Sequence, residues 1–282
     1  MYGIDISNWQ AGLNVDKLAS QIDFAFCKAT EGLNYVDKTC NGFVADFKRN
    51  NLLWGFYHFA RENNPTTEAD FFYNNTKDYF GLGLPVLDYE TGGNSNPAQW
   101  VETFCKRIYE LSGIYPVVYL SASWIDSSIS TWTAAHCPLW VAGYPSARTS
   151  FGDWPFPYSV PRGKMIIWQF TSSLRLNGYN GNLDGNIGYI SKNEWLKYAT
   201  GNVGKWIKNK HGWWYEYPDG TWPKNQWLKI NGKWYWFYNS GYIAENTFVQ
   251  IGGKWYAFDK SGAMVESANR FSVSKNGDIT IN

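Results

Sequence analysis

The stretch Leu84-Pro85-Val86-Leu87-Asp88-Tyr89-Glu90 joins a short apolar run to two acidic residues that lie two positions apart. An apolar run of this length, closed by polar residues, is typical of a β-strand. Side chains two residues apart on a strand point to the same side. The stretch therefore predicts a strand that presents the carboxylates of Asp88 and Glu90 on one side, at its carboxyl end.

Similar runs, bounded by turn residues, occur throughout the first two thirds of the chain. The strands expected from them are Tyr2–Ser7, Phe24–Lys28, Leu53–Phe59, Pro85–Tyr89, Pro116–Leu120, Leu139–Ala142 and Met165–Phe170. Helical patterns lie between them at Thr66–Phe80 and Pro97–Leu111, the second with Asn96 as N-cap candidate. This alternation predicts an α/β fold with parallel strands covered by helices. About eight strands over roughly 190 residues predict a β/α barrel, whose active site would lie at the carboxyl ends of the strands.

A second region, rich in Trp, Tyr and Gly, begins after about Gly201. Its residues recur at intervals of 20 or 21, in the series Trp206, Trp227 and Phe248, the series Gly220, Gly241 and Gly262, and the series Trp214, Trp234 and Trp255. Short repeats with glycine at the turns predict β-hairpins, which bury an apolar face only by stacking on one another. We expect a barrel at residues 1–198, a linker at 199–204 and an all-β hairpin-repeat solenoid at 205–282.

Composition excludes several classes of protein. Hydrophobic residues make up 44% and charged residues 17% of the chain, as in globular proteins, while the aromatic share of 19% is high. The net charge is +1 and no Lys/Arg-rich run occurs, which argues against nucleic-acid binding. No apolar segment of ~18 residues predicts a membrane span, and the first residues do not have the pattern of a secretory signal.

Cysteine and histidine give no metal motif. We interpret the cysteines as buried small hydrophobic residues rather than as a disulfide framework. They are Cys27, Cys40, Cys105 and Cys137. The three histidines include no His-Glu-x-x-His pattern. We therefore expect no metal and no cofactor, and we expect His58 to be an interior histidine with satisfied hydrogen bonds.

Two further acids occupy positions comparable to the pair. Asp5 ends the first predicted strand, and Asp184 lies where a last barrel strand would close the sheet. Two adjacent carboxylates do not ionise equally, so one of Asp88 and Glu90 is expected to keep its proton and act as a general acid. Cleavage of a glycosidic bond uses such a pair. Spacing alone leaves open that these are surface acids, or for Asp184 a turn residue before glycine.

The order of several motifs resembles glycoside hydrolase family 25, which includes the Chalaropsis-type lysozymes. The motifs are Gly3-Ile4-Asp5-Ile6-Ser7, Cys27-Lys28-Ala29-Thr30-Glu31-Gly32, Gly55-Phe56-Tyr57-His58-Phe59, Leu87-Asp88-Tyr89-Glu90, Trp140-Val141-Ala142-Gly143-Tyr144 and Ile167-Trp168-Gln169-Phe170. The resemblance spans about residues 2 to 195. It implies an irregular eight-stranded barrel and a muramidase that hydrolyses the β-1,4 bond between N-acetylmuramic acid and N-acetylglucosamine in bacterial peptidoglycan.

The resemblance also implies a role for each acid. Glu90 matches the general acid, Asp88 its partner carboxylate, and Asp5 and Asp184 the remaining acids of the site. Whether an aspartate or the acetamido group of the substrate attacks the sugar stays open. Further candidates for substrate contact lie at or near strand ends, with barrel packing as the alternative. They are Lys28, Tyr57, Tyr119, Trp140 and Trp168.

The repeats resemble the choline-binding repeats of pneumococcal and phage lytic enzymes between Gly212 and Gly262. The resemblance implies a cage of three aromatic rings around a quaternary ammonium group, held by cation–π attraction. By position the cage would consist of Trp214, Trp227 and Trp236, while a second would contain Ala257 in place of a ring. Expected partners are thus peptidoglycan and choline or another teichoic-acid-type polymer. The alternative is that the tryptophans form only the stacking core.

Two other functions are weighed against this hypothesis. A non-catalytic wall adhesin with an inactive barrel is disfavoured by the presence of all four acids. A wall amidase or peptidase would need a zinc cluster or a paired Cys and His, and the sequence offers neither in a suitable arrangement. We expect a phage or prophage lysin, or an autolysin, that is secreted or released to the cell wall.

Overall fold

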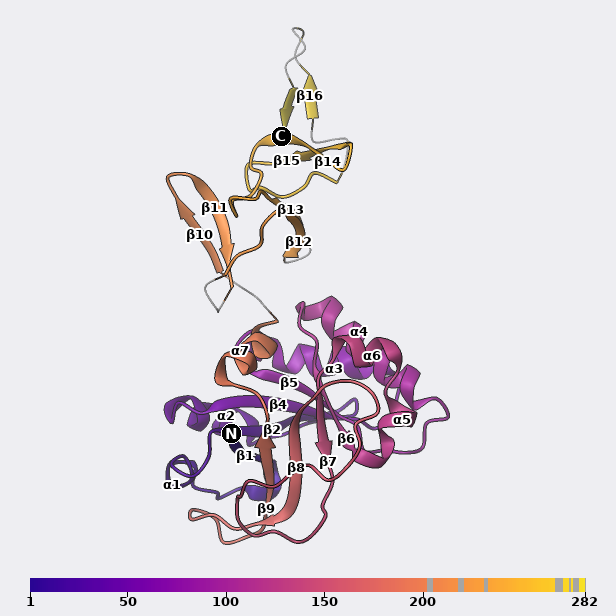
Figure 1. Cartoon of the computed structure of the whole chain (residues 1–282), viewed down its shortest axis with the longest axis vertical. Coiled ribbons are helices and arrows are strands. Elements are labelled where there is room, and N and C mark those ends of the chain that lie inside the picture. The colour runs from indigo at the N-terminus through magenta and orange to yellow at the C-terminus, as the bar shows by residue number, and fades with distance from the viewer. Residues whose placement is uncertain are drawn as a thin grey trace. The chain divides into compact units, whose positions relative to one another are not determined.

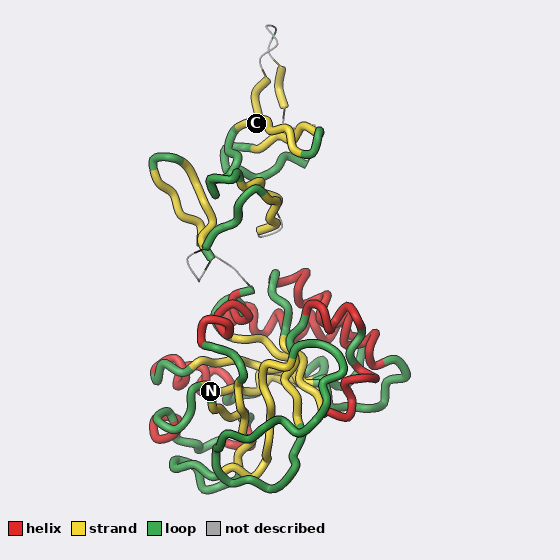
Figure 2. The backbone as a smooth tube through the Cα atoms, viewed as in Figure 1, coloured by secondary structure: helices red, strands yellow, loops and turns green. Residues whose placement is uncertain are grey.

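The computed structural model of this 282-residue chain describes residues 1–201, 205–217, 221–230, 233–266, 271–273, 275 and 279–281. The chain divides into two compact units, residues 1–201 and 202–282. Figure 2 shows strands at the centre of the first unit with helices outside them, and strands with loops in the second. Of the linker expected at residues 199–204, residues 202–204 lie outside the described residues, as does Gly220, the glycine expected at a turn.

The first unit is a closed barrel of eight strands, as predicted (Figure 1). The barrel strands are β1 (Tyr2–Ile6), β2 (Phe24–Glu31), β4 (Leu53–Phe59), β5 (Leu84–Asp88), β6 (Val117–Ser121), β7 (Leu139–Ala142), β8 (Met165–Leu174) and β9 (Leu183–Gly188). Pairing of β1 with both β2 and β9 closes the sheet. The short strand β3 (Tyr35–Val36) adds to β2 outside the barrel.

One expectation about the strands is wrong. The sequence pattern predicted parallel strands, and the barrel strands β1, β2 and β4 to β8 follow it, but β9 runs antiparallel to both β8 and β1. The connection between β8 and β9, residues 175–182, is too short for a helical crossover, which takes a dozen or more residues. The chain therefore turns back directly, and the first residues of β9 lie at the end of the barrel where the other strands finish.

Helices and short 3₁₀ turns surround the barrel and become shorter in its second half. They are η1 (Asn8–Gln10), α1 (Val15–Leu18), α2 (Cys40–Arg49), α3 (Pro65–Thr76), η2 (Lys77–Tyr79), α4 (Pro97–Ser112), η3 (Ala122–Trp124), α5 (Ile125–Ser128), α6 (Thr131–His136) and α7 (Lys192–Thr200). Helix α4 begins as predicted, because the Asn96 side chain accepts a hydrogen bond from the Gln99 amide and Pro97 occupies the first turn. The helix expected to end at Phe80 instead tightens into η2 after Thr76.

Aromatic side chains fill the barrel interior, and a helix covers one of its ends. Inside it, Phe26 stacks on Trp140 with ring centroids 4.4 Å apart. At the amino ends of the strands, Trp195 of α7 packs against Phe24 and Phe26, at 5.0 and 5.2 Å. A helix thus packs over that end of the barrel.

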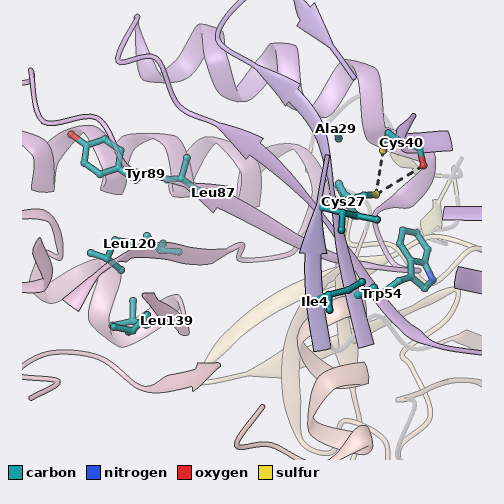
Figure 3. Close-up of a cluster of buried hydrophobic side chains, with 14 of the residues drawn as sticks. Ile4, Cys27, Ala29, Cys40, Trp54, Leu87, Tyr89, Leu120 and Leu139 are labelled. Carbon is teal, nitrogen blue, oxygen red and sulfur yellow. Dashed lines mark hydrogen bonds between the residues drawn. The ribbon is translucent and has the colours of Figure 1, made fainter. Parts of the chain in front are cut away.

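A second core lies between the sheet and the outer helices (Figure 3). All four cysteines are buried with free thiols, in agreement with their interpretation as small hydrophobic residues. In Figure 3 the Cys27 and Cys40 side chains face each other, with their Sγ atoms 3.6 Å apart. No helix in the described part of the chain is long and apolar enough to cross a membrane.

The described residues of the second unit form antiparallel hairpins. The strands pair as β10 (Lys205–Asn209) with β11 (Gly212–Glu216), β12 (Gln226–Ile230) with β13 (Lys233–Phe237), β14 (Thr247–Ile251) with β15 (Lys254–Phe258), and β16 (Phe271–Val273) with β17 (Ile279–Ile281). This agrees with the predicted small all-β repeat domain.

Candidate active site and wall-binding repeats

A cavity of about 380 Å³ opens at the carboxyl ends of the barrel strands. Most of the residues predicted from the sequence to form the site line it. They are Asp5, Lys28, Tyr57, Asp88, Glu90, Tyr119, Trp140 and Asp184. Because these side chains come from strands far apart in the sequence, closure of the sheet is what brings them together.

Alternation along β5 places Asp88 and Glu90 on the cavity side and Tyr89 on the other. The Tyr89 ring is buried in the outer core, 5.5 Å from Trp100. Asp88 is also buried, and burial raises the pKa of its carboxyl well above the ordinary value; the charge of Glu90 and a hydrogen bond with it raise it further. Among the described residues, Asp88 Oδ1 has no hydrogen-bond partner. These effects favour the protonated form of Asp88, which lies next to an exposed Glu90.

Asp5 and Asp184 face each other across the β1–β9 pair, where they are direct register partners. Because β9 runs backwards, Asp184 reaches the mouth from the start of its strand. Burial raises the pKa of Asp5 to about 6, opposed by hydrogen bonds from Asn186 and Gln169. Burial, together with the charges of Asp5 and Glu90, raises the pKa of Asp184 to about 8. At neutral pH, Asp5 is thus mainly ionised and Asp184 mainly protonated.

Two amides that sequence reasoning missed hold Asp5 in place. Gln169 Nε2 donates to both carboxylate oxygens, at 3.1 and 3.0 Å, and Asn186 Nδ2 donates to Oδ2 at 2.7 Å. Each amide is fixed in turn by an aromatic residue. Trp140 Nε1 donates to the Asn186 oxygen at 2.8 Å, and the Tyr119 hydroxyl donates to the Gln169 oxygen at 2.7 Å. Trp140 and Tyr119 therefore orient the acids as well as lining the cavity.

Lys28 and Tyr57 lie on the wall formed by β2 and β4. The Lys28 ammonium pairs with Glu31 and lies 4.6 Å from the centroid of the Phe59 ring. Its positive charge opposes the rise in the pKa of Asp88. Burial, followed by the charges of Asp5 and Asp88, raises the pKa of Tyr57 well above its ordinary value, so its hydroxyl stays protonated as a hydrogen-bond donor.

Trp168 does not line the cavity, contrary to the expectation from its position near a strand end. Its ring is fully buried on the outer side of β8, 5.5 Å from Phe156, and its Nε1 donates to the Gly143 carbonyl at 2.8 Å. Side chains alternate along β8, so the next residue, Gln169, is the one that points into the cavity. Trp168 is a packing residue here.

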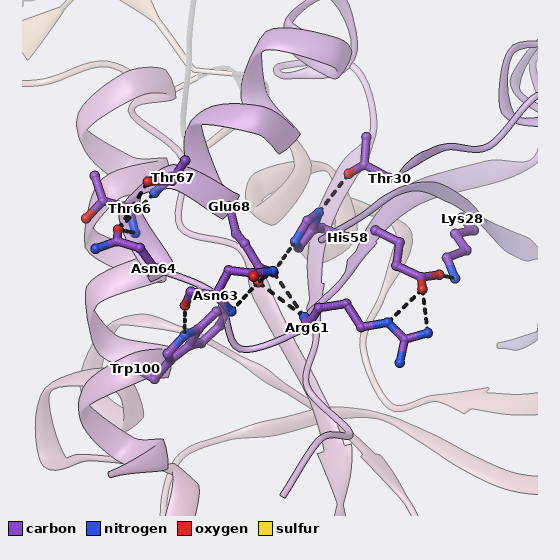
Figure 4. A network of polar contacts seen from close by, with 11 residues as sticks. Lys28, Thr30, His58, Arg61, Asn63, Asn64, Thr66, Thr67, Glu68 and Trp100 are labelled. Atoms are coloured by element: carbon purple, nitrogen blue, oxygen red, sulfur yellow. Dashed lines mark hydrogen bonds and ion pairs between the residues drawn. The ribbon is translucent and has the colours of Figure 1, made fainter. Parts of the chain in front are cut away.

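His58 lies behind the cavity, within a network of buried polar groups (Figure 4). Its Nδ1 is 2.8 Å from the Thr30 hydroxyl and its Nε2 is 2.9 Å from a carboxylate oxygen of Glu68. Burial lowers the pKa of His58, with Glu68 opposing the change. This agrees with the interior histidine expected from the sequence. No group of three or more His, Cys, Asp or Glu suited to a metal ion occurs among the described residues.

The hairpins of the second unit stack through their aromatic rings. The Trp206 ring of the first hairpin lies 4.8 Å from Tyr235 of the second. One repeat later, the Trp227 ring lies 4.9 Å from Tyr256 and 5.7 Å from Phe258. Trp206 and Trp227 therefore join successive repeats, so the packing alternative applies to Trp227.

The strand register corrects one repeat series. Lys208 pairs with Trp213, and the corresponding partners one and two repeats later are Trp234 and Trp255. The equivalent positions are thus all 21 residues apart and include Trp213, not Trp214. A shift of one residue moves a side chain to the other face of a strand.

Two of the three rings expected to form a cage, Trp227 and Trp236, lie side by side, whereas Trp214 packs against a different residue. Trp227 and Trp236 are register partners with ring centroids 5.5 Å apart. Trp214 packs instead against Tyr242, at 5.9 Å, with the two rings nearly perpendicular.

Comparison with known proteins assigns the barrel to a family. The profile of glycosyl hydrolases family 25 matches residues 4–179, more than half of the chain. The chain belongs to this family. A second profile, of the choline-binding repeat, matches residues 225–271.

Individual relatives of this family 25 chain match either about two thirds of it or nearly all of it. Lysozyme M1 of Streptomyces globisporus is 29% identical over 205 residues, which cover 65% of this chain and 66% of that protein. The crystal structure of a lysozyme from Streptomyces coelicolor has 28% identity and a TM-score of 0.60, covering 71% of this chain and 97% of that one. A multimodular pneumococcal cell wall endolysin from phage Cp-1, complexed with choline, has 25% identity and a TM-score of 0.50, covering 99% and 82%.

Trp9 is a cavity residue of this family 25 chain that sequence reasoning missed. It lines the mouth with its side chain 82% exposed. It is held on the η1 turn, where Ser7 and Gln10 form a reciprocal cap and the Asn8 amide donates to Asp37. An exposed indole on a rigid turn offers a flat face to a sugar ring. The available signal was its place four residues after Asp5.

Proposed function

We propose that this family 25 chain is a lysozyme that hydrolyses the β-1,4 bond between N-acetylmuramic acid and N-acetylglucosamine in bacterial peptidoglycan. The observation that carries the proposal is the convergence of four carboxylates on one cavity, two of them at the carboxyl end of β5, on Asp88 and two residues later on Glu90. Hydrolysis of a glycosidic bond needs one protonated and one ionised carboxyl on either side of the bond. Burial raises the pKa of Asp5 only to about 6 but raises that of Asp88 well above its ordinary value, and this difference favours an ionised Asp5 beside a protonated Asp88 near neutral pH.

In the proposed mechanism, Glu90 protonates the leaving oxygen. Asp88 keeps the proton of the pair in the free site, and its hydrogen bond with Glu90 provides the path by which that proton reaches the acid. As the glycosidic bond breaks, positive charge develops on the sugar, and ionised Asp5 stabilises it from a fixed position. Gln169 and Asn186 hold Asp5 ready before the substrate arrives.

The aromatic residues at the mouth bind the polymer. The Trp9 face and the hydroxyls of Tyr57 and Tyr144 lie around the acids, which suits alternating apolar faces and hydroxyl groups of amino sugars. The proposed site of action is the cell wall, which the protein reaches after secretion or release. The match of the second unit to the choline-binding repeat supports anchoring there through choline-bearing wall polymers.

Cleavage is tested on purified peptidoglycan. The wild-type chain is expected to release fragments whose new reducing end, identified by mass spectrometry, is muramic acid. Glu90→Gln is expected to slow release by at least about 10²-fold, the usual contribution of a general acid. A reducing end of glucosamine would redirect the proposal to the other bond. Equal clearing by wild type and Glu90→Gln would exclude Glu90 as the general acid, and binding without any cleavage would leave the adhesin alternative.

Anchoring is tested on a resin that carries quaternary ammonium groups. The full chain is expected to be retained and to elute with free choline, and Trp236→Ala to be retained less, because its ring is partly exposed beside Trp227. Tyr238→Ala, an exposed aromatic two residues away, serves as the matched control. Retention that free choline does not reverse would argue for another wall polymer.

A further inference from the structure

We infer that Glu62 is a positioning residue that holds the segment bearing Glu90 in the geometry needed for proton transfer. The inference rests on the proposed hydrolysis of glycan. Glu62 lies on the connection that follows β4, outside the cavity lining, and no step of the proposed mechanism uses it. The geometry around its carboxylate supplies the argument.

The Glu62 carboxylate accepts one hydrogen bond on each side of Glu90. Its Oε1 accepts from the Tyr89 hydroxyl at 2.6 Å, and its Oε2 accepts from the Gly93 amide at 2.9 Å. Glu62, Tyr89 and Gly93 are called the Glu62 clamp below. Glu90 lies within the clamped segment, just beyond the end of β5, where the sheet no longer restrains the backbone.

The approach of Glu62 to this segment is close. A Cβ atom at position 93 would lie 3.0 Å from Glu62 Oε2, so glycine leaves room for the carboxylate to reach the amide. The other end of the clamp is buried, because the Tyr89 side chain is only 1% exposed. One end of the segment is thus fixed inside the outer core and the other at the surface.

Glu62 itself is held in an unusual backbone conformation. Its φ is 55°, in the left-handed region that residues with a side chain rarely adopt. The amides on both sides of it, those of Arg61 and Asn63, donate to the buried carboxylate of Glu68, at 3.1 and 2.7 Å (Figure 4).

Further contacts fix the same turn. Trp100 Nε1 donates to the Asn63 carbonyl at 2.7 Å. Burial raises the pKa of Glu68, but hydrogen bonds from His58 and from backbone amides outweigh it, and the net shift is downward. Glu68 thus stays ionised and able to accept all these donors. The network behind the cavity imposes the conformation from which Glu62 reaches the Glu90 segment.

The consequence concerns the hydrogen bond between Asp88 and Glu90. Release of the clamp allows residues 90–93 to move, which lengthens that bond and lowers the pKa of Asp88 towards its ordinary value. Proton delivery slows, while the mouth that binds the polymer is unchanged. A clamp defect therefore lowers kcat rather than raising KM, and it moves the alkaline limb of the pH–rate profile to lower pH.

The test compares Glu62→Gln with wild type on a soluble peptidoglycan fragment. The amide can still accept from Tyr89, but it presents a second N–H group to the Gly93 amide in place of an acceptor. We expect kcat to fall about tenfold or more with KM within about twofold, since small misplacement of a catalytic group is costly. Tyr89→Phe removes the hydrogen bond at the buried end of the Glu62 clamp. The double variant is expected to lose no more kcat than the stronger single variant.

Control and counter-results separate this inference from the proposed function. Glu110→Gln changes an exposed glutamate of α4 that pairs with Arg107, and it is expected to leave kcat and the pH profile unchanged. A folded Glu62→Gln protein with wild-type kcat and an unshifted alkaline limb would overturn the inference while cleavage itself stands. A loss confined to thermal stability would also overturn it. Absence of cleavage by wild type would overturn the proposed function and the inference together.

Discussion

Replacement of Asp184 by asparagine is expected to stabilise the barrel at neutral pH. Burial, with the charges of Asp5 and Glu90, raises the pKa of Asp184 from 3.8 to about 8. A carboxyl with a raised pKa holds its proton more tightly in the folded than in the unfolded chain. Its contribution to stability is therefore complete below pH 3.8 and is lost as the pH rises towards 8.

The size of the effect follows from that shift. Between pH 3.8 and pH 7, a span of roughly 3 pH units, the unfolded carboxyl is ionised while the folded one keeps its proton. This span corresponds to about 4 kcal/mol of lost stability at pH 7. Asp184 is partly exposed, and solvent screening reduces this figure, so we expect Asp184→Asn to gain about 2–4 kcal/mol. For a domain of this size, the barrel transition should rise by on the order of 10 °C.

The assay is differential scanning calorimetry of the full chain at pH 4 and pH 7. At pH 4, the gain should shrink to about 0.5 kcal/mol, because that pH lies close to the unfolded pKa of 3.8 and little free energy has yet been lost. Asp78→Asn, at an exposed position on η2, is the control and should change neither scan. A gain of equal size at both pH values, or none at pH 7, would refute the electrostatic reasoning.

Three further predictions concern exposure and burial. Trp9→Ala should raise KM for soluble glycan fragments about tenfold and leave thermal stability within about 0.5 kcal/mol, since the side chain is 82% exposed; an unchanged KM contradicts a role in binding. The four buried thiols should react with a thiol reagent only after unfolding in guanidinium, because burial raises the pKa of Cys27 and of Cys105; rapid reaction of the native protein argues against it. Trp227→Ala should destabilise the hairpin stack by about 2–4 kcal/mol, whereas Trp255→Ala, 69% exposed, should cost under about 0.5; equal losses in fluorescence-monitored melting would contradict the stacking role of Trp227.

The parts of the site that sequence reasoning predicted depend on local geometry. Alternation along a single strand suffices to place Asp88 and Glu90 on one side. A cap and a proline suffice to begin α4 at Pro97. Both properties extend over a few residues and need no knowledge of the rest of the fold.

The parts that it missed depend on contacts distant in sequence. The pattern of Leu183–Gly188 reads alike in either direction, so it does not reveal that β9 is antiparallel. Position near a strand end does not say which side of the sheet a residue faces, and the cavity receives Gln169 where Trp168 was expected. Adjacent tryptophans at 213 and 214 likewise make two repeat alignments possible until the hairpin register distinguishes them.

The antiparallel direction of β9 decides which connection of the chain lies next to the acids. In a barrel of eight parallel strands, the segment before the last strand lies at the pole opposite the chemistry. Here residues 175–182 join β8 to β9 on the same pole as the acids, and the Tyr179 hydroxyl reaches the Trp9 carbonyl at 3.4 Å. Insertions or substitutions in this hairpin tip would reshape the rim of the cavity while the strands bearing the acids stay intact, so the tip is a natural place to change which glycan the proposed lysozyme accepts.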